Sequence, residues 1–118
     1  MTNQADTKAK IAELNDKLRS KVFEGRSNLG QLTVTQGVNG LTPEEKARLF
    51  SEVKGFSDFA EGNDPYGEHD FGAIVIDDEK FFWKIDYYEN SDCQFGTETP
   101  EDPEKSYRVL TVMYADEY

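Results

Sequence analysis

Cysteine and histidine are almost absent from this sequence: Cys93 and His69 are the only ones among 118 residues. A lone cysteine excludes a disulfide within the chain and a cysteine-based zinc site. No apolar run approaches the roughly 18 residues that a membrane-spanning helix needs. The first residues lack the basic and then apolar pattern of a secretion signal. We therefore expect a cytoplasmic protein with no membrane partner.

Basic residues are scarce in the second half of the chain. Residues 58–118 contain seventeen acids and four bases, whereas residues 1–57 contain seven acids and nine bases, and the formal net charge is −11. This asymmetry predicts one strongly negative face. Direct binding of nucleic acid is not expected, because clustered Lys and Arg bind phosphates. The simplest alternative is that the acids keep the protein soluble.

Motifs for catalysis or nucleotide binding are also missing. Neither GxGxxG nor GxxxxGK[ST] occurs in the sequence. Cys93 is a poor nucleophile, because neighbouring acids such as Asp92 disfavour the thiolate. We therefore expect no catalytic residue, no cofactor and no enzyme activity.

Aromatic residues are plentiful at 13%, and their large areas compensate for a hydrophobic content of only 36%. A helix is predicted over residues 6–23, where apolar side chains recur at spacings of three and four. A second helix is predicted from Thr42 to Val53, because Thr42, Pro43 and Glu45 form a strong helix start with a capping box.

Strands are predicted where apolar and polar residues alternate or β-branched residues gather. They span residues 31–36, 71–77, 80–88 and 106–115, with a tight turn at Asp78-Glu79 between the second and third. The order favours a single α+β domain over residues 1–118, in which two helices pack on an antiparallel sheet of about four strands. Residues 1–5 are expected to be a flexible N-terminus.

The third predicted strand points alternate residues, Trp83 and Ile85 among them, toward the core. The expected core consists of Leu14, Leu18, Leu32, Val34, Leu49, Phe50, Val53, Phe71, Trp83, Ile85, Val109 and Leu110.

The densest polar cluster is residues 63–70. Its candidate metal ligands are Asp64, Glu68, His69 and Asp70, which suit a divalent cation. A metal-dependent enzyme that uses the 64–70 loop is therefore one alternative function, with His69 as an acid–base group. A lone histidine is weak evidence for a metal site. The preferred interpretation is that these side chains hold the 57–70 loop against the sheet.

Five segments carry a resemblance: residues 63–72 (NDPYGEHDFG), 81–88 (FFWKIDYY), 102–103 (DP), 108–111 (RVLT) and 117–118 (EY). With these motifs, the sequence resembles a family of small bacterial proteins that is known only as a domain of unknown function and is found on chromosomes and mobile elements. The family supplies no activity, cofactor or catalytic residue. Small acidic proteins of mobile elements are often inhibitors of host defence, so the resemblance implies an anti-CRISPR or antirestriction type of protein.

The charge is large enough for partial mimicry of nucleic acid. A domain of this size is about 35–40 Å long, and a duplex of that length carries about 20 phosphates, against a balance of −13 in residues 58–118. We therefore expect an inhibitor that binds a basic nucleic-acid-binding protein or complex. A housekeeping protein-binding module without mimicry is the other alternative. The expected contact residues, which turns and loops would expose, are Asp77, Asp78, Glu79, Glu89, Asp92, Glu98, Glu101, Asp102 and Glu104.

Overall fold

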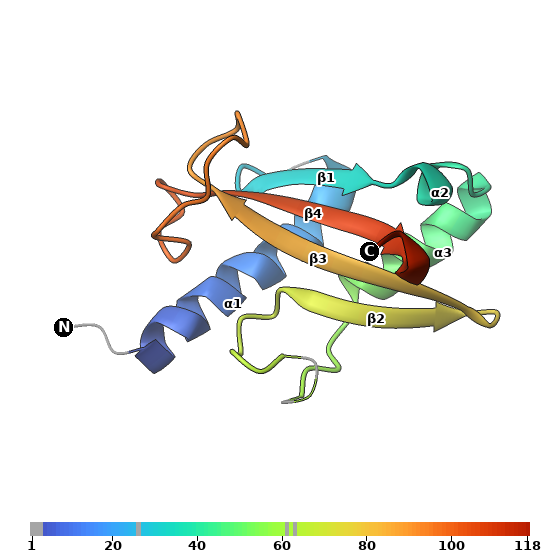
Figure 1. The fold of residues 1–118 in the computed structure, drawn as a ribbon, viewed down its shortest axis with the longest axis horizontal. Helices are drawn as coiled ribbons and strands as arrows, with labels where there is room; N and C mark the ends of the chain where they lie inside the picture. Colours follow the sequence, from blue (N-terminus) through green and yellow to red (C-terminus); the bar gives the residue numbers. More distant parts are fainter. Residues whose placement is uncertain (1–3, 26, 61, 63) are drawn as a thin grey trace.

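The computed structural model describes residues 4–25, 27–60, 62 and 64–118 (Figure 1). Their elements are, in chain order, α1 (Gln4–Lys21), the 3-10 helix η1 (Val22–Glu24), β1 (Gly30–Val34), α2 (Gln36–Asn39), α3 (Pro43–Lys54), β2 (Phe71–Ile76), β3 (Glu79–Tyr88), β4 (Tyr107–Tyr114) and the 3-10 helix η2 (Ala115–Glu117). Helix α1 begins at Gln4, inside the stretch of residues 1–5 for which a flexible N-terminus is predicted. Residues 1–3 of that prediction lie outside the described residues.

The sheet is mixed, which corrects the expectation of an antiparallel sheet. Its strand order is β1-β4-β3-β2. The pairs β2–β3 and β3–β4 are antiparallel, but β1 runs parallel to β4. After β1, the chain passes through α2 and α3 before β2 begins, so β2 runs in the same direction as β1. Two antiparallel connections follow, from β2 to β3 and from β3 to β4, and they give β4 that same direction. Parallel strands need such a crossover.

The described residues also contain three α-helices where two were expected. The additional helix, α2, is a single turn that contains Gly37 and ends at Gly40, two residues that usually mark a turn in a sequence. Glu117 fixes this turn from the other end of the chain. Its carboxylate accepts hydrogen bonds from Thr35 Oγ1 at 2.6 Å and from the Gly37 backbone N–H at 3.0 Å. These hydrogen bonds lower the pKa of the Glu117 carboxyl, and the bond from Thr35 has the largest effect.

The core lies between the sheet and the helices α1 and α3, which cover one face (Figure 1). Trp83 is fully buried at its centre. Of the expected core residues, seven are buried on this side of the sheet: Leu14, Leu18, Leu49, Val53, Trp83, Ile85 and Leu110. Val109 is also buried, but it pairs in register with Asp86 and therefore lies on the opposite face, because neighbouring strand residues point to opposite sides. Leu32, Val34 and Phe50 are half-buried and pack at the edge of this core.

Phe71 was expected in this core and lies on the opposite face of the sheet. It pairs in register with Lys84, and directly opposite residues share a face. On that face Phe71 packs against Phe82, with ring centroids 5.0 Å apart, and against Tyr118 at 6.1 Å. Strand β2 is apolar on both faces, so its sequence gives no alternation from which to assign Phe71.

Candidate functional site

The nine predicted contact acids form two groups at opposite ends of the sheet. Asp77, Asp78 and Glu79 lie at the turn between β2 and β3, whereas the other six lie in the acidic loop, residues 89–106, which joins β3 to β4 (Figure 1). The nine remaining residues of β3, 80–88, separate Glu79 from Glu89, a distance of about 30 Å in an extended strand. The structure therefore gives two acidic centres instead of one continuous row.

The β2–β3 turn is one residue earlier than predicted, at Asp77 and Asp78. Both residues have positive φ angles, 51° and 68°. Two such residues make the tight turn that matches the twist of a hairpin, where Asn and Gly are the usual choice. Both carboxylates are exposed, and Asp77 forms an ion pair with Arg48 of α3 at 3.0 Å.

The first half of the acidic loop folds back onto the end of β3. Tyr88 and Gly96 form an antiparallel bridge, and the backbone N–H of Glu89 donates to the carbonyl of Phe95 at 2.8 Å. Within this closed loop, the side chains of Glu89 and Asp92 are exposed. Their positions are consistent with the expectation that loops expose the acids.

The second half of the loop is held by its own small polar side chains. Thr97 Oγ1 donates to the carbonyl of Lys105 at 2.8 Å, and Ser106 Oγ donates to the carbonyl of Asp102 at 2.7 Å. The Asp102 carboxylate accepts from the backbone N–H of Glu104 at 2.9 Å, so Asp102 serves the turn itself. Glu98 and Glu104 are exposed, while Glu101 and Asp102 are half-buried.

A buried arginine ties this loop to the body of the protein. Arg108 has no exposed surface. Its Nη2 donates to the carbonyl of Pro100, its Nη1 donates to Ser106 Oγ at 3.0 Å, and its Nε donates to Asn15 Oδ1 at 2.6 Å. Its guanidinium carbon also lies 5.1 Å from the centroid of the Tyr87 ring. Burial lowers the pKa of Arg108, and neutral acceptors with the aromatic ring compensate its charge.

The same network continues to the 64–70 loop through Asn15 and Tyr87. Asn15 Nδ2 donates to the Tyr87 hydroxyl and to the Glu68 carbonyl, both at 2.9 Å. The Tyr87 hydroxyl donates to Glu68 Oε1 at 2.9 Å, and burial is the main cause of the raised pKa of Tyr87. Side chains from α1, β3 and β4 thus hold the acidic loop and the 64–70 loop to the same hydrogen-bonded network.

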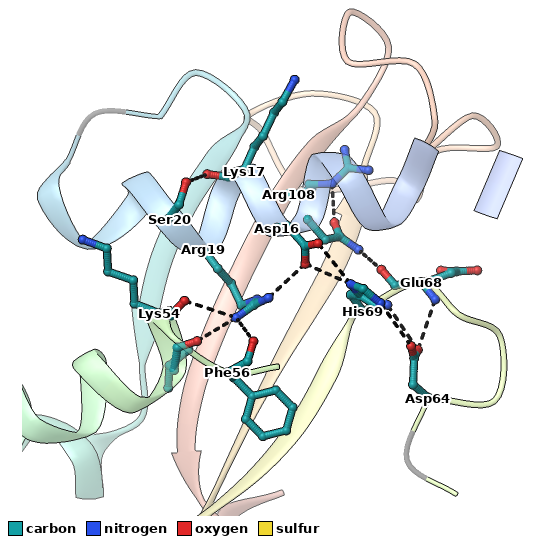
Figure 2. Close-up of polar contacts among 12 residues, drawn as sticks. Asp16, Lys17, Arg19, Ser20, Lys54, Phe56, Asp64, Glu68, His69 and Arg108 are labelled. Atoms are coloured by element: carbon teal, nitrogen blue, oxygen red, sulfur yellow. Dashed lines mark hydrogen bonds and ion pairs between the residues drawn. The ribbon is translucent and has the colours of Figure 1, made fainter. Parts of the chain in front are cut away.

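The 64–70 loop is held against α1 as well as against the sheet. Asp64 Oδ1 accepts from the backbone N–H groups of Glu68 and His69, both at 3.1 Å. His69 Nδ1 lies 3.0 and 3.1 Å from the two carboxylate oxygens of Asp16 in α1 (Figure 2). The imidazole also stacks on Phe59, with centroids 3.9 Å apart. The loop therefore depends on a helix contact that the sequence interpretation did not include.

Through these contacts, three of the candidate metal ligands, Asp64, Glu68 and His69, have structural roles. Asp64 caps backbone N–H groups, and Glu68 accepts from Tyr87. Asp70 is half-buried, and burial, followed by the charge of Glu68, raises its pKa. Among the residues that the structure describes, no group of three or more His, Cys, Asp or Glu side chains is placed to hold a metal ion.

We predict that His69→Ala lowers the free energy of unfolding by about 1–2 kcal/mol, since it removes the stacking on Phe59 and the hydrogen bond to Asp16. Urea denaturation measures this change. His69→Phe is the matched control, because it keeps a stacked ring and loses only the polar contacts of the imidazole, which are the hydrogen bond to Asp16 and the 3.8 Å contact of Nε2 with Asp64 Oδ2. It is expected to lose less stability. Stoichiometric binding of Mn²⁺ or Zn²⁺ that disappears in His69→Ala would contradict the structural role.

Arg19 is a second buried base that the sequence interpretation missed. Its Nη1 donates to the carbonyls of Val53 at 2.8 Å and Phe56 at 3.0 Å, at the end of α3 (Figure 2). Its guanidinium carbon lies 4.8 Å from the centroid of the Trp83 ring. The sequence offered one signal for the burial of these two arginines, namely their position. Arg108 lies two residues before the core residue Leu110 in its strand, and Arg19 lies next to the core residue Leu18 in its helix.

Comparison with known proteins identifies a family without an assigned activity. Residues 34–117 match the sequence model of a family described as "Protein of unknown function (DUF3768)". No curated protein and no solved structure matches the chain. The matched range contains both acidic centres and Arg108, whereas α1 lies outside it. None of the described helices is long and apolar enough to cross a membrane.

Proposed function

Since the chain belongs to the DUF3768 family of proteins of unknown function, we propose a function from its own residues: it binds the basic surface of a nucleic-acid-binding protein through the acidic loop. The observation that carries this proposal is the buried Arg108, which anchors a loop whose first sixteen residues, 89–104, contain six acids and no base. Acidic side chains that only keep a protein soluble do not require that their backbone be held in one conformation.

An anchored loop has an energetic advantage in binding. Ordering a flexible segment costs free energy at the moment of association, and the hydrogen bonds of the acidic loop reduce that cost in advance. The loop also presents Phe95, whose surface is 68% exposed. Interfaces are commonly centred on an aromatic side chain with a charged rim around it, and Phe95 lies in chain order between Asp92 and Glu98. The acids would guide a basic partner to this ring.

The finer proposal is that this binding inhibits a bacterial defence complex of the anti-CRISPR or antirestriction type. The longest dimension of the protein is 47 Å, and a DNA duplex of that length carries about 28 phosphates. The two separated acidic centres can imitate only part of such a row. We therefore favour occupation of a basic nucleic-acid groove by the acidic loop over continuous mimicry of a duplex.

We predict that reversing three loop charges, in the variant Glu98→Lys, Glu101→Lys and Glu104→Lys, weakens binding about 100-fold. Each exposed ion pair contributes up to about 1 kcal/mol, and reversal replaces attraction with repulsion. The partner is first recovered by pull-down from the native host, and its affinity is then measured by calorimetry. Binding is also expected to weaken as salt is raised, because salt screens exposed charges.

The matched control makes the same charge change on α3 and η2, in the variant Glu44→Lys, Glu52→Lys and Asp116→Lys. These three side chains are exposed and lie outside the acidic loop. The control is expected to retain most of the affinity. Equal losses in the two variants would mean that only the net charge matters, and undiminished binding by the folded loop variant would refute the proposed surface.

A further inference from the structure

A small pocket lies at the opposite end of the sheet from the acidic loop, between α3 and the β2–β3 hairpin. Its volume is about 100 Å³. Its apolar wall includes Leu49, Phe81 and Tyr114, and the rings of Phe81 and Tyr114 pack with centroids 4.6 Å apart. Nothing in the proposed role of the acidic loop uses this pocket.

The rim of the pocket is negatively charged. It carries the carboxylates of Glu45, Asp77 and Glu79 against the single guanidinium of Arg48. Arg48 pairs with Asp77 at 3.0 Å, and Glu45 accepts from the backbone N–H of Thr42 in the capping box at 2.9 Å. Glu79 makes no ion pair with any residue that the structure describes, so its exposed carboxylate is available to a ligand.

The electrostatic environment of Tyr114 agrees with this charge. Burial, followed by the charges of Glu79 and Glu45, raises the pKa of its hydroxyl. The pocket therefore combines an aromatic wall with a negative rim. The negative rim would repel an anionic ligand, whereas it and the aromatic wall would attract a cation.

The size of the pocket restricts the cation. A volume of about 100 Å³ equals roughly the share of three water molecules in the liquid, which suits one side-chain head group and excludes a nucleotide. A guanidinium is planar, stacks on aromatic rings and pairs with a carboxylate through two parallel hydrogen bonds. A lysine ammonium offers neither the stacking plane nor the fork.

We propose that this pocket binds the guanidinium group of an arginine side chain that a partner protein presents, with Glu79 as its carboxylate and the ring of Tyr114 as its stacking surface. The proposal rests on the proposed function in one respect, namely that the partner is a basic protein. Arg48 competes with the incoming arginine for the same rim. When an arginine enters the pocket, Arg48 must either share the Asp77 carboxylate with it or break its ion pair with Asp77.

The test is an NMR titration of the full chain with Nα-acetyl-arginine methylamide, and with the citrulline analogue as the uncharged control of the same shape. We expect saturable shifts of backbone amides in α3 and around Glu79, with a dissociation constant in the millimolar range, and no such shifts with citrulline. Glu79→Gln is expected to weaken binding about fivefold, whereas Glu52→Gln on α3 leaves it unchanged. Arg48→Ala is expected to strengthen binding, since it removes the internal competitor.

The proposal is overturned if no saturable shifts occur, if citrulline binds as well as arginine, or if Glu79→Gln binds like the parent. The spectrum of each variant reports directly on its fold. This experiment contains no partner protein, so its failure leaves the proposal for the acidic loop intact. Conversely, the variant with reversed charges at residues 98, 101 and 104 is expected to bind the arginine probe normally, because these residues lie at the other end of β3.

Discussion

Arg108→Ala is expected to destabilise the protein by about 3–5 kcal/mol, because removal of one member of a buried polar network leaves its partners without compensation. The Asn15 side chain and the Pro100 carbonyl would each lose their hydrogen bond to the guanidinium. The substitution also leaves a cavity beside the Tyr87 ring. Urea denaturation measures the loss of stability.

The same substitution is expected to release the acidic loop. Hydrogen exchange of the Lys105 and Glu89 amides, whose N–H groups are bonded within the loop, is expected to accelerate more than exchange in β3. Lys105→Ala is the matched control, because it removes an exposed positive charge from the same loop and is expected to change stability by less than about 0.5 kcal/mol. Similar, small effects of the two substitutions would contradict the anchoring role of Arg108.

Trp83→Ala is expected to cost about 3–5 kcal/mol, as large-to-small changes of buried aromatic residues do. Trp83 is fully buried and packs edge-on against Phe56, with centroids 5.5 Å apart, and against Phe59 at 6.1 Å. The guanidinium of Arg19 also covers the ring, so the end of α3 would lose part of its support. The melting temperature and urea denaturation measure this effect.

Trp83→Phe is the informative control for this substitution. The indole Nε1 is buried and has no hydrogen-bond partner in the described part of the chain, so phenylalanine loses contact area without losing a hydrogen bond. A Cβ atom on Gly72 would lie only 2.2 Å from Nε1, which shows how closely the backbone of β2 approaches the ring. We expect Trp83→Phe to retain much of the stability. An unchanged melting temperature for Trp83→Ala would mean that the ring does not support the core.

Local signals in the sequence predicted the elements well. The capping box at Thr42 is present as expected: its Oγ1 accepts from the Glu45 backbone N–H at 3.1 Å, and the Glu45 carboxylate accepts in return. The alternation in residues 80–88 correctly placed Trp83 and Ile85 in the core. Such signals succeed because helix capping and strand alternation depend on residues a few positions apart.

The sequence by itself thus determined the α+β class, the positions of the main helices and strands, and the acidic character of the second half. The tertiary structure alone decided that β1 pairs with β4, that the acids divide between two ends of the sheet, and that Arg108 meets Asn15. These two residues are 93 positions apart in the chain. No local preference relates such distant residues; their contact follows from the way the whole core packs, since a charge loses its hydration on burial and must find acceptors wherever the fold supplies them.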